Sequence, residues 1–282
     1  MEMEAPKLRD LIEILDQIAP KQWAESWDNP GLQVGFLDQT IEKIVLSLDP
    51  SPQAVEYAAA QEAQLLLTHH PLIFKPLSNI RGNDYPGSVV YDAIRRGICI
   101  VAMHTNLDAA AEGINTILAG LLGLEKIEPL CPEKGGQEVR VEHGKKTSYK
   151  IGLGCIGDLS KPCSLSEFVQ RTKKLLGLEL LKLVGDTACT VKRVAVVGGS
   201  GGSLIKDAFF KGADLLVTGD VTYHQAREAE FLGLAVIDGG HFATERVAFR
   251  QFGKYLKKKI SNDGWKIEVL FNDKETDPLI YI

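Results

Sequence analysis

The sequence predicts an α/β protein of two related lobes, each with a mixed, mostly parallel sheet covered by helices. Short apolar runs alternate with segments whose apolar residues recur at three- and four-residue steps, which is the pattern of strands alternating with helices. The length of 282 residues exceeds that of one typical domain. Polar clusters follow several of the apolar runs, so we expect a metal site in the cleft between the lobes.

The first lobe is expected over residues 1–125. It opens with an amphipathic helix, Leu8–Ile18, which ends before Pro20. The predicted strands then span 44–48, 64–68 and 98–102, and the predicted helices span 53–61, 88–96 and 110–121. Ligands of such sheets bind at the carboxyl ends of the strands, so the residues that follow these strands are the first candidates for a site.

A segment at residues 126–148 is expected to connect the lobes. Its composition shifts to Glu, Lys, Gly and Pro, which indicates a solvated connection or a hairpin. His143 lies in this segment, and we expect it to be exposed and inert.

The second lobe is expected over residues 149–282. Ser164 and Glu167 have the spacing of a capping box at the start of a helix. The predicted strands span 149–155, 191–197, 213–220, 234–238 and 266–271, and the predicted helices span 165–176 and 243–258. This order repeats the alternation of the first lobe.

A glycine loop, Gly198–Ser203, joins a predicted strand to a helix. Backbone amides of such a loop can cradle a phosphate, or the glycines can serve close packing of the backbone. The loop lacks the Gly-Lys-Ser/Thr ending of a P-loop. Both interpretations stay open at this stage.

Three of the six histidines follow two of the predicted strands. His69 and His70 end the strand at 64–68, and His104 ends the strand at 98–102 with Asp108 close behind. Side chains alternate along a strand, so we expect His69 and His70 to diverge, an arrangement that suits two ions, or an ion and a substrate, better than one ion. The turn at Asp28-Asn29-Pro30-Gly31 is interpreted as structural, although Asp28 could face the site.

His241 and Glu245 follow a glycine pair and are four residues apart. A helix that starts near His241 places both side chains on one face, where they can reach the same ion. The full set of candidate donors contains nitrogen and oxygen without sulfur: His69, His70, His104, Asp108, His241 and Glu245. It suits zinc, manganese, iron or cobalt, and it is large enough for two ions about 3.5–4 Å apart. Such a centre lowers the pKa of a bridging water, so its natural chemistry is hydrolysis.

Composition excludes several other classes of protein. The net charge of −5 gives no basic footprint for nucleic acid. No apolar run is long enough to span a bilayer, and no secretory signal opens the chain, so we expect a cytoplasmic protein without a membrane partner. The five cysteines contain no C-x-x-C motif and are expected to be reduced.

Several motifs carry a resemblance to a known family. They are Leu67-Thr68-His69-His70-Pro71-Leu72-Ile73-Phe74, His104-Thr105-Asn106-Leu107-Asp108, Gly198-Gly199-Ser200-Gly201, Thr218-Gly219-Asp220 with Tyr223-His224, Gly240-His241-Phe242-Ala243-Thr244-Glu245, and the earlier Trp27-Asp28-Asn29. In this order, over nearly the whole chain, they resemble the NGG-interacting-factor-like family, whose members are named GTP cyclohydrolase 1 type 2 homologues.

The resemblance implies two related lobes, a dinuclear metal centre between them and a toroidal homohexamer. It implies that His69, His70, Asp108, His241 and Glu245 are metal ligands and that His104 ligates or supports them. Longer family members carry an extra domain in the middle. This chain is short there, so we expect any gating by that domain to be absent.

The implied reaction opens the imidazole ring of GTP or a related nucleotide by attack of a metal-bound hydroxide. His104 or His224 would then move protons. Two alternatives remain: a two-metal phosphoesterase, and a non-catalytic metal-binding or regulatory interaction protein. An open, water-bearing metal position would separate an enzyme from a structural site.

Overall fold

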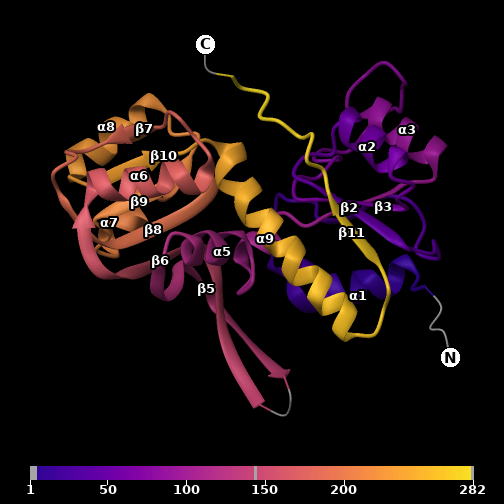
Figure 1. Ribbon diagram of the computed structural model, residues 1–282, viewed down its shortest axis with the longest axis horizontal. Coiled ribbons are helices and arrows are strands. Elements are labelled where there is room, and N and C mark those ends of the chain that lie inside the picture. The colour runs from indigo at the N-terminus through magenta and orange to yellow at the C-terminus, as the bar shows by residue number, and fades with distance from the viewer. Residues whose placement is uncertain (1–4, 143–144, 281–282) are drawn as a thin grey trace. The chain divides into compact units, whose positions relative to one another are not determined.

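The computed structural model describes the backbone of residues 5–142 and 145–280, and the side chains of residues 5–132 and 150–280 (Figure 1). The expectation for His143 falls outside these residues. Two compact units are present: unit 1 comprises Met1–Leu107 with Phe249–Ile282, and unit 2 comprises Asp108–Ala248. Each unit contains a mixed sheet with helices, which confirms the predicted α/β class.

The sheet of unit 1 has five strands in the order β1-β4-β3-β2-β11. Four of them run parallel, and β1 is antiparallel to β4 at one edge. In chain order the strands are β1 (Gly31–Val34), β2 (Lys43–Ser47), β3 (Leu65–Thr68), β4 (Cys99–Ala102) and β11 (Glu268–Phe271). The register aligns Ser47 with Thr68 and Thr68 with Ala102, so β2, β3 and β4 end side by side. Residues that follow these three strands therefore emerge at one edge.

Burial explains the central position of β3 and β4. All four residues of each strand are buried, as expected for strands covered on both faces. Side chains of β2, β3 and β4 pack with the helices α2 (Pro52–Ala60) and α3 (Gly87–Arg96) into one hydrophobic core. The first helix, α1 (Leu8–Ile18), has the predicted bounds and buries Leu8, Leu11, Ile14, Leu15 and Ile18.

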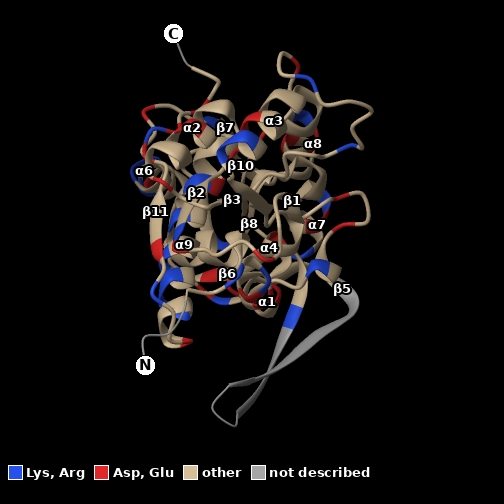
Figure 2. Ribbon diagram, turned by 90° about the vertical axis from the view of Figure 1, so that its right-hand side faces the viewer, with Lys and Arg blue, Asp and Glu red and all other residues tan. Residues whose placement is uncertain are grey.

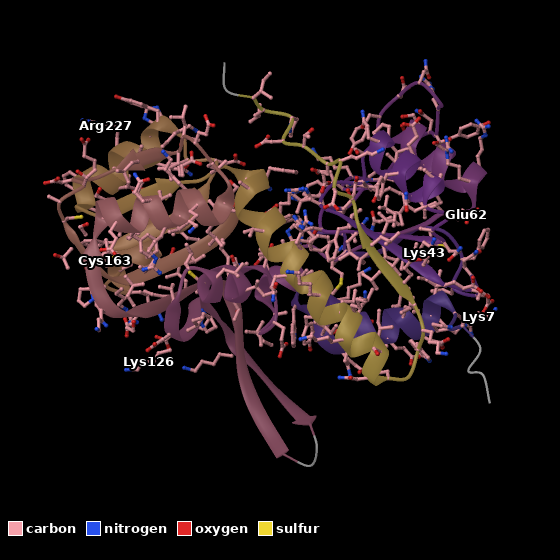
Figure 3. The ribbon with its side chains drawn as sticks, viewed as in Figure 1. Lys7, Lys43, Glu62, Lys126, Cys163 and Arg227 are labelled. Atoms are coloured by element: carbon pink, nitrogen blue, oxygen red, sulfur yellow. The ribbon has the colours of Figure 1, made fainter. Side chains whose placement is uncertain are left out.

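Strand β11 belongs to unit 1. From the sequence, this strand is expected in the second lobe, at residues 149–282. It pairs in parallel with β2, and Lys43 on β2 forms an ion pair with Glu268 on β11 at 3.3 Å (Figure 3 labels Lys43). A Cβ on Gly253 would lie 2.5 Å from the Phe271 ring, so glycine is needed where the last helix meets β11. The unit boundary falls within this helix, α9 (His241–Asn262), between Ala248 and Phe249.

The sheet of unit 2 has six strands in the order β5-β6-β8-β9-β10-β7. The inner strands β8, β9 and β10 are parallel, and the others pair antiparallel. The bounds are β5 (Leu124–Glu142), β6 (Lys145–Ser164), β7 (Lys182–Val184), β8 (Thr190–Ser200), β9 (Leu215–Gly219) and β10 (Ala235–Asp238). Residues 126–142 and 145–148 thus lie in the strands of the β5 and β6 hairpin, one of the two forms expected for that segment, and extend this sheet.

The helices of unit 2 include α6 (Leu165–Leu176), α7 (Ile205–Phe210) and α8 (Tyr223–Leu232). Ser164 accepts a hydrogen bond from the Glu167 amide at 3.2 Å, which confirms the predicted start of α6. The helix predicted at 110–121 is shorter. It forms α5 (Ile114–Leu121) after Gly113, and a separate helix, α4 (Thr105–Ala109), spans the boundary between the units.

Charge is mixed over both units, where Lys and Arg are interspersed with Asp and Glu (Figure 2). None of the helices in the described ranges combines the length and apolar character needed to cross a lipid bilayer.

Candidate metal site

Unit 1 brings three predicted site histidines together. His69, His70 and His104 follow β3 and β4, and their ligand atoms lie within 4.8 Å of one another. The ring centroids are 5.1 Å apart for His69 and His70, 5.3 Å for His69 and His104, and 5.6 Å for His70 and His104. We call these three residues the histidine cluster. Its donor atoms are close enough for the cluster to hold a metal ion.

The expected divergence of His69 and His70 is wrong. Strand β3 ends at Thr68, so both histidines lie in a bend where the alternation of a strand does not apply. The Thr68 hydroxyl donates to the backbone oxygen of His70 at 2.8 Å and so stabilises the bend. The two rings consequently lie next to each other.

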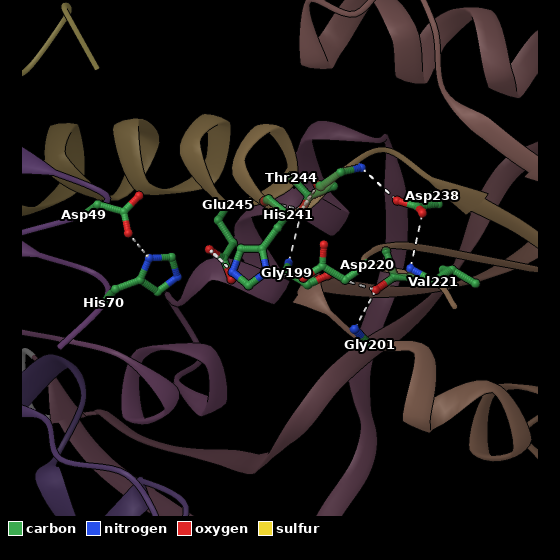
Figure 4. A network of polar contacts seen from close by, with 12 residues as sticks. Asp49, His70, Gly199, Gly201, Asp220, Val221, Asp238, His241, Thr244 and Glu245 are labelled. Atoms are coloured by element: carbon green, nitrogen blue, oxygen red, sulfur yellow. Dashed lines mark hydrogen bonds and ion pairs between the residues drawn. The ribbon is translucent and has the colours of Figure 1, made fainter. Parts of the chain in front are cut away.

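Each ring of the histidine cluster contacts an oxygen through Nδ1. His69 Nδ1 is 2.7 Å from the Met103 backbone oxygen, and His70 Nδ1 is 2.8 Å from Asp49 Oδ1 (Figure 4 shows the second contact). His104 Nδ1 is 2.8 Å from Asp28 Oδ1. Carbonyl and carboxylate oxygens only accept, so Nδ1 must carry the proton. In the neutral imidazole this leaves the lone pair on Nε2, the nitrogen that could ligate a metal.

Asp28 is a site residue whose role the sequence left open. Its side chain is 0% exposed, and its carboxylate also accepts from the Thr105 amide at 3.0 Å and from the Thr105 hydroxyl. Burial raises the pKa of this carboxyl, but hydrogen bonds from His104 and Thr105 outweigh burial and lower the pKa to about 2. Asp28 is therefore ionised at neutral pH and orients His104.

The sequence interpretation missed Asp49 and Glu275. Asp49 comes just after β2, and Glu275 follows β11. Glu275 accepts hydrogen bonds from the Ser47 hydroxyl at 2.7 Å, the Leu48 amide at 2.9 Å and the Asp49 amide at 2.8 Å. The rule that sites form at the carboxyl ends of parallel strands could have found Asp49, whereas no local signal marks Glu275.

Unit 2 brings His241 and Glu245 together in the first turns of α9. His241 Nε2 lies 3.1 Å from Glu245 Oε2, and the Glu245 side chain is buried. His241 Nδ1 lies 2.7 Å from Asp220 Oδ2, and Asp220 follows β9 (Figure 4). The predicted helical spacing is confirmed, and His241 repeats the Nδ1 pattern of the histidine cluster.

The glycine loop packs closely beside Glu245. Its amides donate to side chains within unit 2: Gly198 to Asn115 at 2.8 Å, Gly199 to Thr244 at 3.1 Å, and Gly201 to Thr218 at 2.8 Å. A Cβ on Gly199 would lie 2.1 Å from Glu245 Oε1. These contacts favour the packing interpretation of the loop over a phosphate cradle.

Asp108 and His224 also belong to unit 2. Asp108 is half-buried on α4, its backbone oxygen accepts from the Asn115 side chain at 3.0 Å, and it lines a cavity of about 440 Å³. His224 is exposed at the start of α8, with its ring 5.6 Å from that of Tyr223. Its role in proton transfer stays a prediction.

Similarity to known proteins covers nearly the whole chain. The model of the family Duf34/NIF3 (NGG1p interacting factor 3) matches residues 6–278. A Clostridium perfringens protein named "GTP cyclohydrolase 1 type 2 homolog" is 32% identical over 98% of this chain and 100% of its own length. A Streptomyces coelicolor protein of the same name is 33% identical over 97% of this chain and 93% of its own length.

A solved structure has the same fold. The Bacillus cereus protein related to NIF3 has a TM-score of 0.89 and 27% identity, covering 99% of this chain and 100% of that chain. The family match and the two relatives confirm the resemblance carried by the motifs. The chain therefore belongs to the Duf34/NIF3 (NGG1p interacting factor 3) family.

Proposed function

We propose that this protein is a dinuclear metal-dependent hydrolase that opens the purine imidazole ring of GTP or a related nucleotide. One observation carries the proposal. His69, His70 and His241 each direct Nδ1 at a carbonyl or carboxylate oxygen, which leaves Nε2 as the nitrogen that can ligate a metal. Metal-ligating histidines almost always have such a partner, because it fixes the tautomer and the ring orientation. The same arrangement at these three proposed ligands supports a metal role.

The geometry around His241 fits a cation. Oxygens face both ring nitrogens, Asp220 at Nδ1 and Glu245 at Nε2. A cation bound by Nε2 and by the Glu245 carboxylate would neutralise this arrangement without requiring a protonated imidazole. The proposed ligands are His69, His70, Asp108, His241 and Glu245. Their nitrogen and oxygen donors suit zinc, iron, manganese or cobalt.

Side chains of the chain itself would orient the ligands and accept a proton. Two bound divalent ions would supply a water that ionises near neutral pH. Asp49, Asp28 and Asp220 keep three of the rings in a fixed orientation. His104 Nε2 can take up a proton, because Asp28 stabilises the imidazolium that results. We therefore propose His104 as the proton acceptor. The name shared by the two relatives supports a nucleotide substrate.

We propose that zinc is one of the metals bound, that the chain assembles as a homohexamer, and that it acts in the cytoplasm. Metal analysis and the molar mass in solution test the first two.

Turnover by the Asp108→Ala variant tests the function. Metal-loaded wild type is incubated with GTP and with a panel of phosphoesters, and ring opening is followed by ultraviolet absorbance. We expect GTP turnover that requires metal and falls at least about 100-fold in the variant. Asp92→Ala, which removes a surface ion pair with Arg96, is the control and should keep full activity.

Two other outcomes would contradict the proposal. Metal-dependent cleavage of phosphoesters in place of GTP ring opening would identify a two-metal phosphoesterase. Absence of turnover at full metal occupancy would identify a metal-binding or interaction protein.

A further inference from the structure

The cavity of about 440 Å³ in unit 2 lies beside Asp108, and its volume is typical of pockets for small molecules. We call it the Asp108 pocket. Its lining comes from α4 and the segment after it, from α5, and from the base of the β5 and β6 hairpin. Of these lining residues Asp108 alone is a proposed metal ligand, so metal binding by itself does not account for the rest of the pocket.

Small residues give the pocket its shape. Three consecutive alanines, 109–111, line it on the α4 side, and Gly152 and Gly154 line it on the β6 side. A Cβ on Gly152 would lie 2.2 Å from the Cys131 backbone oxygen, so β5 and β6 approach closely and present bare backbone here. Walls of methyl groups and backbone suit a flat ring rather than a branched or flexible ligand.

The cations at the pocket are already opposed by carboxylates of the chain. Lys150 Nζ lies 4.0 Å from Glu128 Oε2, and both residues line the pocket. Arg193 lies 3.3 Å from Glu128 and 3.0 Å from Asp158, so its charge is also opposed. A triphosphate would find no unopposed cation among the lining residues that the structure describes.

A polar pair on the pocket wall can recognise the edge of a ring. Thr116 Oγ1 lies 3.5 Å from Cys155 Sγ, and both residues line the pocket. Burial raises the pKa of Cys155 to about 11, so the thiol is neutral at physiological pH. The threonine hydroxyl can donate to a ring nitrogen or accept from an exocyclic amine.

We propose that the Asp108 pocket binds the uncharged heterocyclic part of the substrate, a purine base or nucleoside, and leaves the phosphates outside. The inference rests on the proposed function, because Asp108 is both an edge of the pocket and a proposed metal ligand. A pocket that seats the ring next to Asp108 favours hydrolysis of the ring over hydrolysis of a phosphoester.

Binding of guanosine and of GTP to the full chain tests the pocket. Isothermal titration calorimetry measures both affinities, first for the metal-free chain in chelator and then for the chain loaded with cobalt. Ala111→Leu fills the pocket, and Thr116→Val removes the hydroxyl without changing its shape. The matched controls, Ala188→Leu and Thr190→Val, change exposed residues that do not line the pocket. Cobalt affinity is measured separately by absorbance for every variant.

We expect wild type to bind guanosine. In the presence of chelator, the dissociation constants of GTP and guanosine should agree within about threefold. Ala111→Leu should weaken guanosine binding at least about tenfold, and Thr116→Val about fivefold. Cobalt affinity should be unchanged in every variant, and both control variants should bind guanosine like wild type.

The proposal is overturned if guanosine does not bind, if both pocket variants bind like wild type, or if GTP binds over about 100-fold more tightly than guanosine in chelator. Cobalt binding with GTP turnover but no effect of the pocket variants would refute the pocket alone. Guanosine binding by a chain that binds no metal would support the pocket and refute the proposed function.

Discussion

Glu275 fixes the position of Asp49, because its Oε1 accepts the Asp49 amide at 2.8 Å while Oε2 accepts the Leu48 amide at 2.9 Å. Asp49 in turn accepts from His70 Nδ1 at 2.8 Å. A residue far along the chain thereby sets the orientation of a proposed ligand. The tautomer of His70 depends on this chain of contacts.

Glu275→Gln should weaken metal binding. Glutamine replaces one carboxylate oxygen with an amide NH2 group, which donates and cannot accept, so the loop at Ser47–Asp49 loses an acceptor. We expect cobalt affinity to fall about tenfold and the ring nitrogen signals of His70 to shift in an NMR spectrum. Glu268→Gln, which removes the surface ion pair with Lys43, is the control. Unchanged affinity and unchanged His70 signals would show that Glu275 has no positioning role.

Asp28→Asn should lower stability in a manner that depends on pH. The pKa of Asp28 lies at about 2 in the folded chain, below its ordinary value of 3.8. The ionised carboxylate therefore stabilises the fold fully above about pH 4, and this contribution is lost as the pH falls toward 2. We expect a loss of about 1–2 kcal/mol in the free energy of unfolding at pH 7, after allowance for solvent screening.

Urea titrations in chelator at pH 7, 5 and 3 measure this difference. The difference in unfolding free energy between wild type and Asp28→Asn should be smaller at pH 3 than at pH 5. A difference that grows between pH 5 and pH 3 would contradict the assignment.

Gly199→Ala should damage the metal site by displacing Glu245. The new Cβ would lie 2.1 Å from Glu245 Oε1, and the residue has a φ of +63°. Gly212→Ala is a matched control, since Gly212 has a φ of +74° and a Cβ there would meet no atom within 4 Å. Both variants should lose about 1 kcal/mol to backbone strain, and Gly199→Ala alone should lose metal affinity, about tenfold or more. Equal metal affinity in the two variants would contradict this prediction.

Cys155 should react slowly with alkylating agents. It is buried, and burial raises its pKa to about 11, so about one thiol in a thousand is ionised at pH 8. Cys163, labelled in Figure 3, is only partly buried. Timed labelling with iodoacetamide and mass spectrometry should therefore find Cys163 modified well before Cys155. Equal rates would contradict the burial of Cys155.

Local signals predicted the helices and strands well. The bounds of α1 and α6 match the sequence expectation at both ends, because apolar periodicity and terminal residues such as Pro20 and Ser164 are encoded locally. The strand ends that carry His69 and His104 were also found, because buried parallel strands have continuous apolar runs.

Long-range relationships were not readable from the sequence. Asp28 and His104 are 76 residues apart, and no period or motif links a carboxylate to a ring at that distance. The pairing of β11 with β2 joins the end of the chain to its beginning. The apolar sequence of a strand does not indicate which strand it will pair with. The divergence expected of His69 and His70 was wrong because β3 ends at Thr68, one residue before His69. Strand ends are uncertain by one or two residues in a sequence prediction, and side chains alternate only within the strand.

A titration of the chelated chain with zinc, manganese or cobalt, followed by the rate of GTP ring opening, tests the central claim most directly. Two ions that share the ligands should activate the enzyme together. We predict that the rate rises to a plateau at two ions bound per chain with at least one of these metals. Full occupancy at two ions without any ring opening, or a plateau reached at one ion, would contradict the account.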